Sequence, residues 1–294
     1  MLTILLLSLI TLVPPPAATP DAQAPAAGKA PAAAPVAKHL EWTIDGVKRE
    51  AVIYIPPTAT TSSTPIIFAF HGHGGTARHA ANTFEYQKLW PEAISVYMQG
   101  LPTAGALTDP KGERNGWQKH SGDQNDRDLK FFDEVLATLR KDYKVDDARI
   151  YAAGHSNGGG FTYLLWASRG GILAAVAPSS AGPGSIRDAL ALTPKPCMHI
   201  GGEKDPLVKF ANQQRTMERD RRVNQCEDTP QEWGPHALLY PSKIGTPFVS
   251  VIHSGGHEFY TPALPLIVKF FKEHPKPAAS PAPPTPDAPK PASP

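Results

Sequence analysis

Several apolar segments of strand length in this chain are followed closely by glycine. The segments 65–70, 149–153 and 197–200 are mostly apolar, and a glycine stands within two positions of the end of each. A further segment, 248–252, is followed by the pair Gly255-Gly256. Continuous apolar runs of this length are typical of strands covered on both faces. Because glycine permits sharp turns, the pattern predicts a parallel sheet whose strand ends carry tight loops.

Between these strands the chain carries amphipathic segments. Within 128–143, Leu129, Phe132, Val135 and Leu139 recur at helical spacing. Further helices are expected at 77–89, 159–169, 208–222 and 262–273, and further strands at 40–44, 51–55, 94–98 and 174–177. The alternation predicts an α/β fold, with a mostly parallel sheet, helices on both faces and an antiparallel N-terminal edge.

Proline marks the expected limits of the globular part. Seven of the 33 prolines lie between positions 14 and 35, and nine lie between 275 and 294. Such Pro/Ala-rich segments bury too little apolar surface to offset chain entropy. The apolar start of the chain indicates a signal peptide at 1–22, and hence a secreted or periplasmic protein. We expect a linker at 23–38, one globular domain at 39–274 and a disordered tail at 275–294.

Composition excludes several classes of partner. The formal net charge of +2 argues against binding driven by the phosphates of nucleic acid. Two cysteines make neither a disulfide-rich scaffold nor a four-cysteine zinc site. No apolar run reaches the roughly 20 residues that span a bilayer. We therefore expect a monomer with no nucleic-acid partner and no stable membrane span.

The segment Gly154-His155-Ser156-Asn157-Gly158 fits the pattern Gly-x-Ser-x-Gly, between an expected strand and an expected helix. In such a turn the serine backbone is strained, and side chains two positions before and after it would collide. Glycine at those positions removes the collision and exposes the serine oxygen. The context predicts that Ser156 is a nucleophile, at the N-terminus of a helix that favours a developing negative charge.

A serine nucleophile needs a base and a carboxylate that orients the base. Asp205 follows the strand at 197–200, and Glu203 is the alternative; we favour Asp205 because Pro206 holds it rigidly. The Asp205 side chain could equally cap the helix that follows. His257 follows the strand at 248–252 in a glycine loop, whereas the alternative, His253, continues the strand and is expected to be packed.

The loop His71-Gly72-His73-Gly74-Gly75 follows the strand at 65–70. Two backbone N–H groups are expected to bind the oxyanion, that of Asn157 and that of His73. The pair His71 and His73 also permits metal ligation, but no Cys, Asp or Glu cluster stands at metal spacing. The remaining alternative for His71 is that it packs and hydrogen-bonds under the loop.

Together these residues resemble a known family. The run 146–159, with His71-Gly-x-Gly-Gly75, Gly202-x-x-Asp205 and Gly255-Gly-His257, looks like the polyhydroxybutyrate depolymerase and feruloyl esterase family of secreted α/β-hydrolases. The resemblance covers about residues 40–274. It implies an α/β-hydrolase fold with Ser156 as nucleophile, Asp205 as acid and His257 as base. Many members carry Trp-Pro shortly after Gly-Gly-His, where this chain has Glu258-Phe259-Tyr260.

The resulting hypothesis is a serine esterase without a cofactor. Its substrates would be feruloyl or other plant cell-wall esters, or short polyhydroxyalkanoate esters, in polymeric or soluble form. One alternative is a serine peptidase of the prolyl oligopeptidase type, which usually carries a large extra domain. Another alternative is a non-catalytic binding protein on a hydrolase fold, which has no need of all three groups in order.

Aromatic residues near these motifs are candidates for substrate binding. Trp117, in the long loop expected at 100–126, either stacks on substrate or anchors the loop to the core. Phe259 and Tyr260 adjoin His257 and are expected to line the pocket. The two cysteines, Cys197 and Cys226, are either bonded or free, because sequence does not place them within bonding distance.

Overall fold

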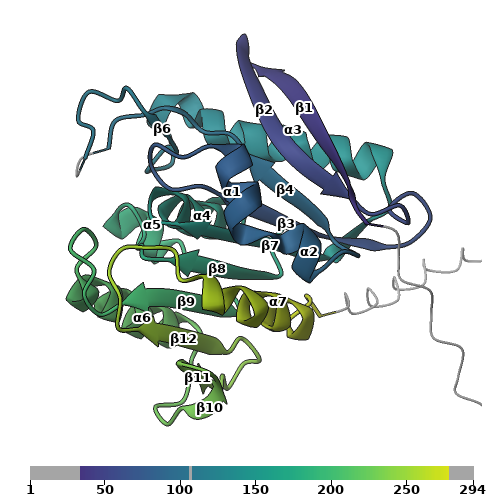
Figure 1. Ribbon diagram of the computed structural model, residues 1–294. Helices are drawn as coiled ribbons and strands as arrows, with labels where there is room; N and C mark the ends of the chain where they lie inside the picture. Colours follow the sequence, from purple (N-terminus) through teal and green to yellow (C-terminus); the bar gives the residue numbers. More distant parts are fainter. Residues whose placement is uncertain (1–33, 106–107, 278–294) are drawn as a thin grey trace, which may run out of the picture. The chain divides into compact units, whose positions relative to one another are not determined.

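The computed structural model describes residues 34–105 and 108–277 (Figure 1). The predicted signal peptide at 1–22, most of the predicted linker at 23–38 and most of the predicted tail at 275–294 lie outside the described residues. The first strand begins at Val36, slightly before the predicted start of the globular domain at 39.

Ten strands form one sheet in the order β1-β2-β4-β3-β7-β8-β9-β12-β11-β10. They are β1 (Val36–Ile44), β2 (Val47–Ile55), β3 (Thr64–Phe70), β4 (Ile94–Met98), β7 (Val145–His155), β8 (Ala175–Ser179), β9 (Cys197–Gly202), β10 (Gln231–Gly234), β11 (Ala237–Tyr240) and β12 (Phe248–His253). Within the run β4-β3-β7-β8-β9-β12, each pair of neighbouring strands is parallel. Both ends of the sheet are antiparallel.

Helices cover both faces of the sheet, as predicted. They are α1 (Ala77–Phe84), α2 (Tyr86–Leu89), α3 (Arg127–Asp142), α4 (Asn157–Arg169), α5 (Ile186–Leu190), α6 (Phe210–Val223) and α7 (Leu264–Glu273), with 3₁₀ turns η1 (Asp123–Asp126) and η2 (Thr261–Ala263). Buried residues of α1, α2 and α7 form one core, and those of α3, α4 and α6 form the other (Figure 1).

The central strand β3 shows how the two cores share one strand. All seven of its residues are buried. Ile66, Phe68 and Phe70 belong to the core of α3 and α4, while Ile67 and Ala69 belong to the core of α1 and α7. This alternation is the two-residue period of a strand, and burial on both faces explains why the run at 65–70 contains no polar position.

Several features differ from the sequence prediction, among them the short helix α5, which was not predicted. The single helix predicted at 77–89 is two helices, because Glu85 has a left-handed backbone (φ 45°) that ends α1. The hairpin of β10 and β11 adds an antiparallel edge that the sequence did not predict. The predicted loop at 100–126 contains a short antiparallel pair, β5 (Leu101–Pro102) and β6 (Asn115–Gly116).

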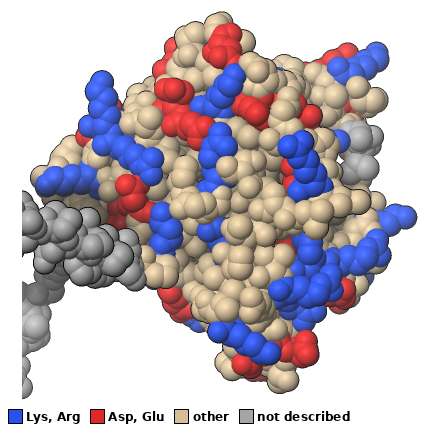
Figure 2. All heavy atoms as spheres, turned by 180° about the vertical axis from the view of Figure 1, so that it is seen from behind, with Lys and Arg blue, Asp and Glu red and all other residues tan. Residues whose placement is uncertain are grey.

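On the face seen in Figure 2, Lys and Arg are interspersed with Asp and Glu. No helix of the described residues is both long enough and apolar enough to cross a bilayer.

The parallel arrangement of the strands positions the site. The loops after β3, β7, β9 and β12 all leave the sheet at one edge, where ligands bind in such folds.

Candidate active site

Ser156 lies in the turn between β7 and α4. Its backbone has φ 56° and ψ −119°, a conformation that costs a non-glycine residue free energy. The turn is held from one side by a hydrogen bond of 2.8 Å from the Ser156 N–H to the carbonyl of Ser179. The strained serine at a strand-to-helix turn is the geometry that the Gly-x-Ser-x-Gly pattern predicts.

The two glycines of the motif are required by close backbone contacts. A Cβ atom at Gly154 would lie 2.3 Å from the carbonyl oxygen of Gly158. A Cβ atom at Gly158 would lie 2.2 Å from the carbonyl oxygen of Phe70, on the neighbouring strand β3. Because both obstacles are backbone atoms, one in helix α4 and one in strand β3, neither can move aside without distorting the helix or the sheet.

Ser156, His257 and Asp205 come from three different loops and form one hydrogen-bonded line. The Oγ of Ser156 lies 2.7 Å from Nε2 of His257, and Nδ1 of His257 lies 2.8 Å from Oδ2 of Asp205. With the Nδ1 proton on the imidazole, that N–H donates to the carboxylate and Nε2 accepts from the hydroxyl. This arrangement lets the imidazole take the hydroxyl proton as the oxygen attacks.

Asp205, and not Glu203, points at the imidazole. Asp205 is only 5% exposed, whereas Glu203 is exposed. The Oδ1 atom of Asp205 accepts the N–H groups of Leu207 and Val208 at 2.9 and 2.8 Å. The alternative role as a helix cap is wrong, because α6 begins after Lys209; one oxygen of Asp205 accepts from the turn before that helix, while the other faces His257.

His253 is packed, as its place in the strand predicts. It is 4% exposed, and its ring stacks on Tyr260 with centroids 4.5 Å apart. Burial lowers the pKa of His253. Tyr260 is therefore a partner of His253 and is absent from the described lining of the cavity beside Ser156, so its predicted role in the pocket is not supported.

The loop after β3 presents its backbone to the site. Gly72, His73 and Asn157 all line the cavity that contains Ser156. Within the described residues, the N–H groups of His73 and Asn157 donate to no protein acceptor. Both predicted oxyanion donors are thus at the cavity with their hydrogens unused.

His71 packs under this loop and holds it. Its Nδ1 lies 2.8 Å from the carbonyl of Gly72, and its Nε2 accepts the N–H of Gly100 at 3.0 Å. Burial lowers the pKa of His71 to about 4, so the ring is neutral at pH 7. With both nitrogens occupied by backbone groups, His71 is not available as a metal ligand.

His73 is tied to the loop at 100–126. Its Nε2 lies 3.0 Å from Oδ2 of Asp109, which also accepts the N–H of Arg114. These bonds, that of Arg114 first, lower the pKa of Asp109 to about 2. The loop and the oxyanion segment are thus joined by a charged side chain that accepts several hydrogen bonds.

Trp117 does not contact substrate, and this candidate is corrected. The side chain is 0% exposed, its Nε1–H donates to the carbonyl of His71 at 2.9 Å, and its ring stacks on Phe161 at 5.2 Å. Trp117 therefore anchors the long loop to the core, which was the alternative. A tryptophan beside glycine and asparagine in a loop has the same sequence signature in both roles.

The side chain of Asn157 has a structural role that the sequence analysis missed. Its Oδ1 accepts the Trp117 N–H at 2.7 Å and its Nδ2 donates to the Trp117 carbonyl at 3.3 Å. The residue after the nucleophile thus contributes an N–H to the cavity and also clamps the long loop. In the sequence, the only sign of this role is that Asn157 occupies the variable position after the serine in the Gly-x-Ser-x-Gly pattern.

The cavity beside Ser156 has a volume of about 480 Å³, within the range of small-molecule sites. Its described lining carries the cations Arg114 and Lys119 and no carboxylate. Phe259 lies in an adjoining cavity of about 460 Å³, on the other side of Gly72 and His155. Phe259 thus lines a pocket next to the site, packed on Phe84 at 4.4 Å.

His155, the residue before the nucleophile, separates the two cavities and stays uncharged. Its ring centroid lies 5.1 Å from that of His257. Burial first, and then the neighbouring His257, lower the pKa of His155 to about 4. Because the ring of His155 is neutral, it places no second positive charge beside His257 when that imidazole becomes protonated.

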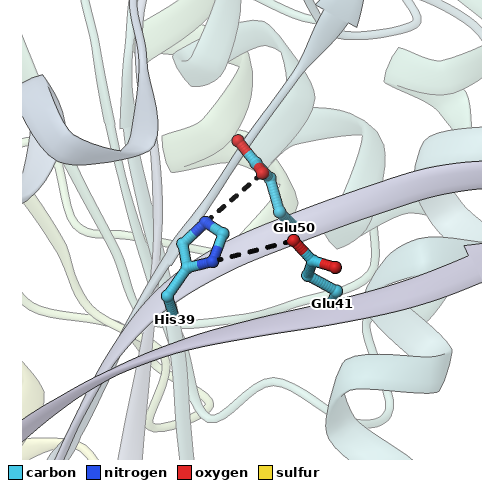
Figure 3. A group of neighbouring side chains, drawn as sticks. All are labelled: His39, Glu41 and Glu50. Atoms are coloured by element: carbon cyan, nitrogen blue, oxygen red, sulfur yellow. Dashed lines mark ion pairs between the residues drawn. The ribbon is translucent and has the colours of Figure 1, made fainter.

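Among the described residues, one group of three side chains has ligand atoms close enough to share a metal ion: His39, Glu41 and Glu50. Figure 3 shows the imidazole between the two carboxylates, on strands β1 and β2. Lys48 pairs with Glu41 at 2.7 Å and lowers the pKa of that carboxyl. Because the two nitrogens of His39 face different carboxylates, the group is an exposed ion-pair cluster outside the site.

The two cysteines are free. Cys197 is buried at the start of β9, and Cys226 is partly buried after α6. Burial raises the pKa of both thiols, which makes neither of them a reactive thiolate at pH 7.

Known proteins are similar to this chain in sequence and in fold. A bifunctional acetylxylan esterase/xylanase of Neocallimastix patriciarum is 24% identical over 204 residues, which is 66% of this chain and 28% of that protein. A probable feruloyl esterase C of Aspergillus clavatus is 28% identical over 180 residues, 61% of this chain and 59% of that protein. The chain is thus similar to proteins named feruloyl esterase and acetylxylan esterase. The matched region thus spans less than two thirds of either relative.

A solved structure adds the fold. The acetyl xylan esterase from Aspergillus awamori matches with a TM-score of 0.59 and 14% identity, over 80% of this chain and 99% of the other. No family model matches the chain. The predicted α/β-hydrolase fold and the predicted resemblance to feruloyl esterases are confirmed. The resemblance to polyhydroxybutyrate depolymerases stays a prediction.

Proposed function

We propose that this protein is a serine esterase that hydrolyses carboxylic esters through an acyl-enzyme. One observation carries the proposal: Ser156, His257 and Asp205 form a continuous hydrogen-bonded line at 2.7 and 2.8 Å, and Ser156 and His257 line a cavity of about 480 Å³. The relatedness to proteins named feruloyl esterase and acetylxylan esterase supports the same reaction class.

In the first half-reaction, the oxygen of Ser156 attacks the ester carbonyl while Nε2 of His257 takes its proton. Asp205 keeps the imidazole in the tautomer that can accept this proton and stabilises the imidazolium that results. The backbone N–H groups of Asn157 and His73 donate to the oxyanion of the tetrahedral intermediate. The imidazolium then protonates the leaving alcohol, and an acyl group stays on Ser156.

In the second half-reaction, water attacks the carbonyl carbon of the acyl group, and His257 takes a proton from that water. The tetrahedral intermediate collapses, the acid is released, and Ser156 regains its proton. His155 remains neutral throughout at pH 7, because its pKa is about 4. No cofactor enters either half-reaction.

The substrates that we propose are feruloyl and other plant cell-wall esters, with short polyhydroxyalkanoate esters as the second choice. The names of the relatives support the first class. The two adjoining cavities, which share Gly72, His73 and His155, offer space on both sides of the oxyanion segment for an acyl part and an alcohol part. Export by residues 1–22 and a monomeric state complete the proposal.

A substrate panel tests this function. Initial rates are measured with methyl ferulate, acetylated xylan, hydroxybutyrate oligomers and a chromogenic peptide amide, for the wild type and for Ser156→Ala. We expect methyl ferulate or acetylated xylan to be cleaved, and the variant to lose at least about 10³-fold in rate while keeping its fold. Cleavage of the amide alone would favour the peptidase, and a folded wild type inactive on every substrate would favour the binding protein.

A further inference from the structure

Asp205 has a second side-chain donor besides His257. Gln213, on helix α6, donates from Nε2 to Oδ2 of Asp205 at 3.0 Å. The same nitrogen donates to the carbonyl of Val208 at 2.7 Å. Both amide hydrogens are thus used, and the amide carbonyl oxygen points the other way, away from the carboxylate.

The sheet leaves room for this amide. Helix α6 packs on β9, and a Cβ atom at Gly201 of that strand would lie 2.6 Å from Oε1 of Gln213 (Figure 1). Gln213 itself is 0% exposed. Glycine at position 201, inside β9, therefore serves to admit the glutamine side chain.

The hydrogen bonds continue beyond Gln213 into the core. Oε1 of Gln213 lies 3.2 Å from Nε2 of His199, and Nδ1 of His199 lies 3.0 Å from the hydroxyl of Tyr163. That hydroxyl lies 2.6 Å from Oδ2 of Asp220. His199, Tyr163 and Asp220 are each 0% exposed, so water cannot complete any of these bonds.

The direction of each bond is set by the one before it. Since Oε1 of Gln213 can only accept, Nε2 of His199 must donate. If His199 is neutral, its Nδ1 has no hydrogen and must accept the single hydroxyl proton of Tyr163. The short contact between Tyr163 and Asp220 then needs a proton from Asp220. All of these hydrogen bonds can form together only if the group carries one proton more than an ionised Asp220 and a neutral His199 would provide.

We infer that Gln213 is a positioning residue for Asp205, locked in one orientation by the buried chain His199–Tyr163–Asp220, in which Asp220 is a neutral carboxylic acid that donates to Tyr163. The first part of this inference rests on the proposed function. Gln213 holds Oδ2 of Asp205 where His257 needs it, and the chain prevents the amide from turning its oxygen toward the carboxylate.

The surroundings favour the proton on Asp220 over a proton on His199. Burial raises the pKa of Asp220 and lowers that of His199 to about 4. Arg219 donates to Oδ1 of Asp220 from Nη2 at 2.5 Å and from Nε at 3.1 Å. The other titratable groups beside Asp220 are Tyr163 and the thiol of Cys197. Arg219 opposes the shift, but it contacts only the oxygen that does not face Tyr163.

Replacement of Gln213 tests the positioning role. Gln213→Leu removes both donors, and we expect kcat on the best ester to fall about 10- to 100-fold with little change in KM. The acid limb of kcat/KM is expected to move to higher pH, because a carboxylate relieved of one donor interacts more strongly with the imidazolium of His257. Met217→Leu, one turn further along α6 and also buried, is the control and should change neither quantity.

Replacement of Asp220 tests the proton. Asparagine can donate from Nδ2 to Tyr163 and accept from Arg219 at Oδ1, as the neutral acid does. We therefore expect Asp220→Asn to keep the melting temperature within about 2 °C of the wild type, while Asp220→Leu lowers it by several degrees. A larger fall in Asp220→Asn would show that Asp220 is ionised and overturn this part.

The outcomes separate this inference from the proposed function. If the wild type hydrolyses no ester, the proposed function fails, and the melting temperature of Asp220→Asn still decides where the proton lies. If the wild type is active, Ser156→Ala is inactive, and Gln213→Leu keeps both its kcat and its acid limb, the positioning role is wrong although the esterase proposal stands.

Discussion

The loops that carry Ser156 and Asp205 hold their side chains by different means. Ser156 is placed by backbone geometry: a strained φ of 56° and close contacts at Gly154 and Gly158. Asp205 is placed by hydrogen bonds, two from backbone N–H groups and one from the buried amide of Gln213. Both loops leave the same edge of the sheet. The position of Ser156 depends on neighbours that lack side chains, whereas the position of Asp205 depends on a side chain that donates to it.

This difference explains why the two loops are not equally visible in the sequence. Glycines at fixed positions around a serine form a local pattern, so Ser156 can be found from five consecutive residues. The support of Asp205 comes from a helix further along the chain, and no local spacing links Gln213 or His199 to it. The sequence therefore predicts Asp205 as the acid, but it does not predict the groups that hold its side chain.

The largest expected effect comes from adding a methyl group on the serine side. Gly158→Ala would place Cβ 2.2 Å from the carbonyl of Phe70, so the turn must open and the adjacent strands must shift. We expect a loss of stability of about 4 kcal/mol or more and the loss of activity, measured by thermal unfolding and initial rates.

Gly171→Ala is the matched control, because a Cβ atom there meets nothing within 4 Å. It should leave both the melting temperature and the rates near those of the wild type. If Gly158→Ala behaves like Gly171→Ala, backbone crowding does not place Ser156.

On the acid side, Asp205→Asn should lower kcat by about 10⁴-fold while the fold persists. The amide can no longer stabilise the imidazolium, and it favours the wrong tautomer of His257. Glu203→Gln is the control, since Glu203 is exposed and makes no contact with His257. Steady-state kinetics on one ester decide between them, and a greater loss in Glu203→Gln would reverse the assignment of the acid.

A smaller effect is expected at Trp117, which links the long loop to the serine side. Trp117→Phe removes the bond to His71 and some of the packing on Phe161. We expect a loss of about 1–3 kcal/mol in stability and no change in the ratio of kcat/KM for methyl ferulate to that for an acetyl ester. A selective loss on ferulate with unchanged stability would instead mean that the ring contacts substrate.

Both loops also share a pH dependence of stability. His71 near the serine, His155 beside it and His199 behind the acid each have a pKa of about 4, lowered by burial. In the unfolded chain these rings take up protons near pH 6.5, whereas in the folded chain they do so only near pH 4. Because the unfolded state binds more protons in that window, the free energy of unfolding falls as the pH drops from about 6.5 to 4.

Melting temperatures between pH 7 and pH 4.5 measure this effect. We expect a steady decrease in the wild type and the same decrease in His79→Gln, because His79 is exposed. A melting temperature that stays constant across this range would mean that the buried rings are charged in the folded protein.

Much of the fold could be predicted because its strands are buried on both faces. Apolar runs such as 65–70 and 94–98 fall within one residue of the observed strands β3 and β4. The hairpin of β10 and β11 escaped prediction because it lies at an edge, with most of its residues partly exposed and no clear alternation. The break at Glu85 escaped it because a left-handed glutamate has no sequence signal.

The site could be predicted where its chemistry requires a particular residue type at a particular distance along the chain. Trp117 could not be assigned, because its indole would look the same in sequence whether it met substrate or Phe161. Its burial is set by the register of the short pair β5 and β6, which brings the loop back over the core.

The central claim is that Ser156 attacks an ester carbonyl. Its most direct test is the intact mass of the protein, followed by peptide mapping, after reaction with an organophosphate that labels serine nucleophiles. We expect one adduct per chain on Ser156, loss of ester hydrolysis in parallel with labelling, and no adduct in a folded Ser156→Ala variant. An active wild type that remains unlabelled, or one labelled equally in the variant, would contradict it.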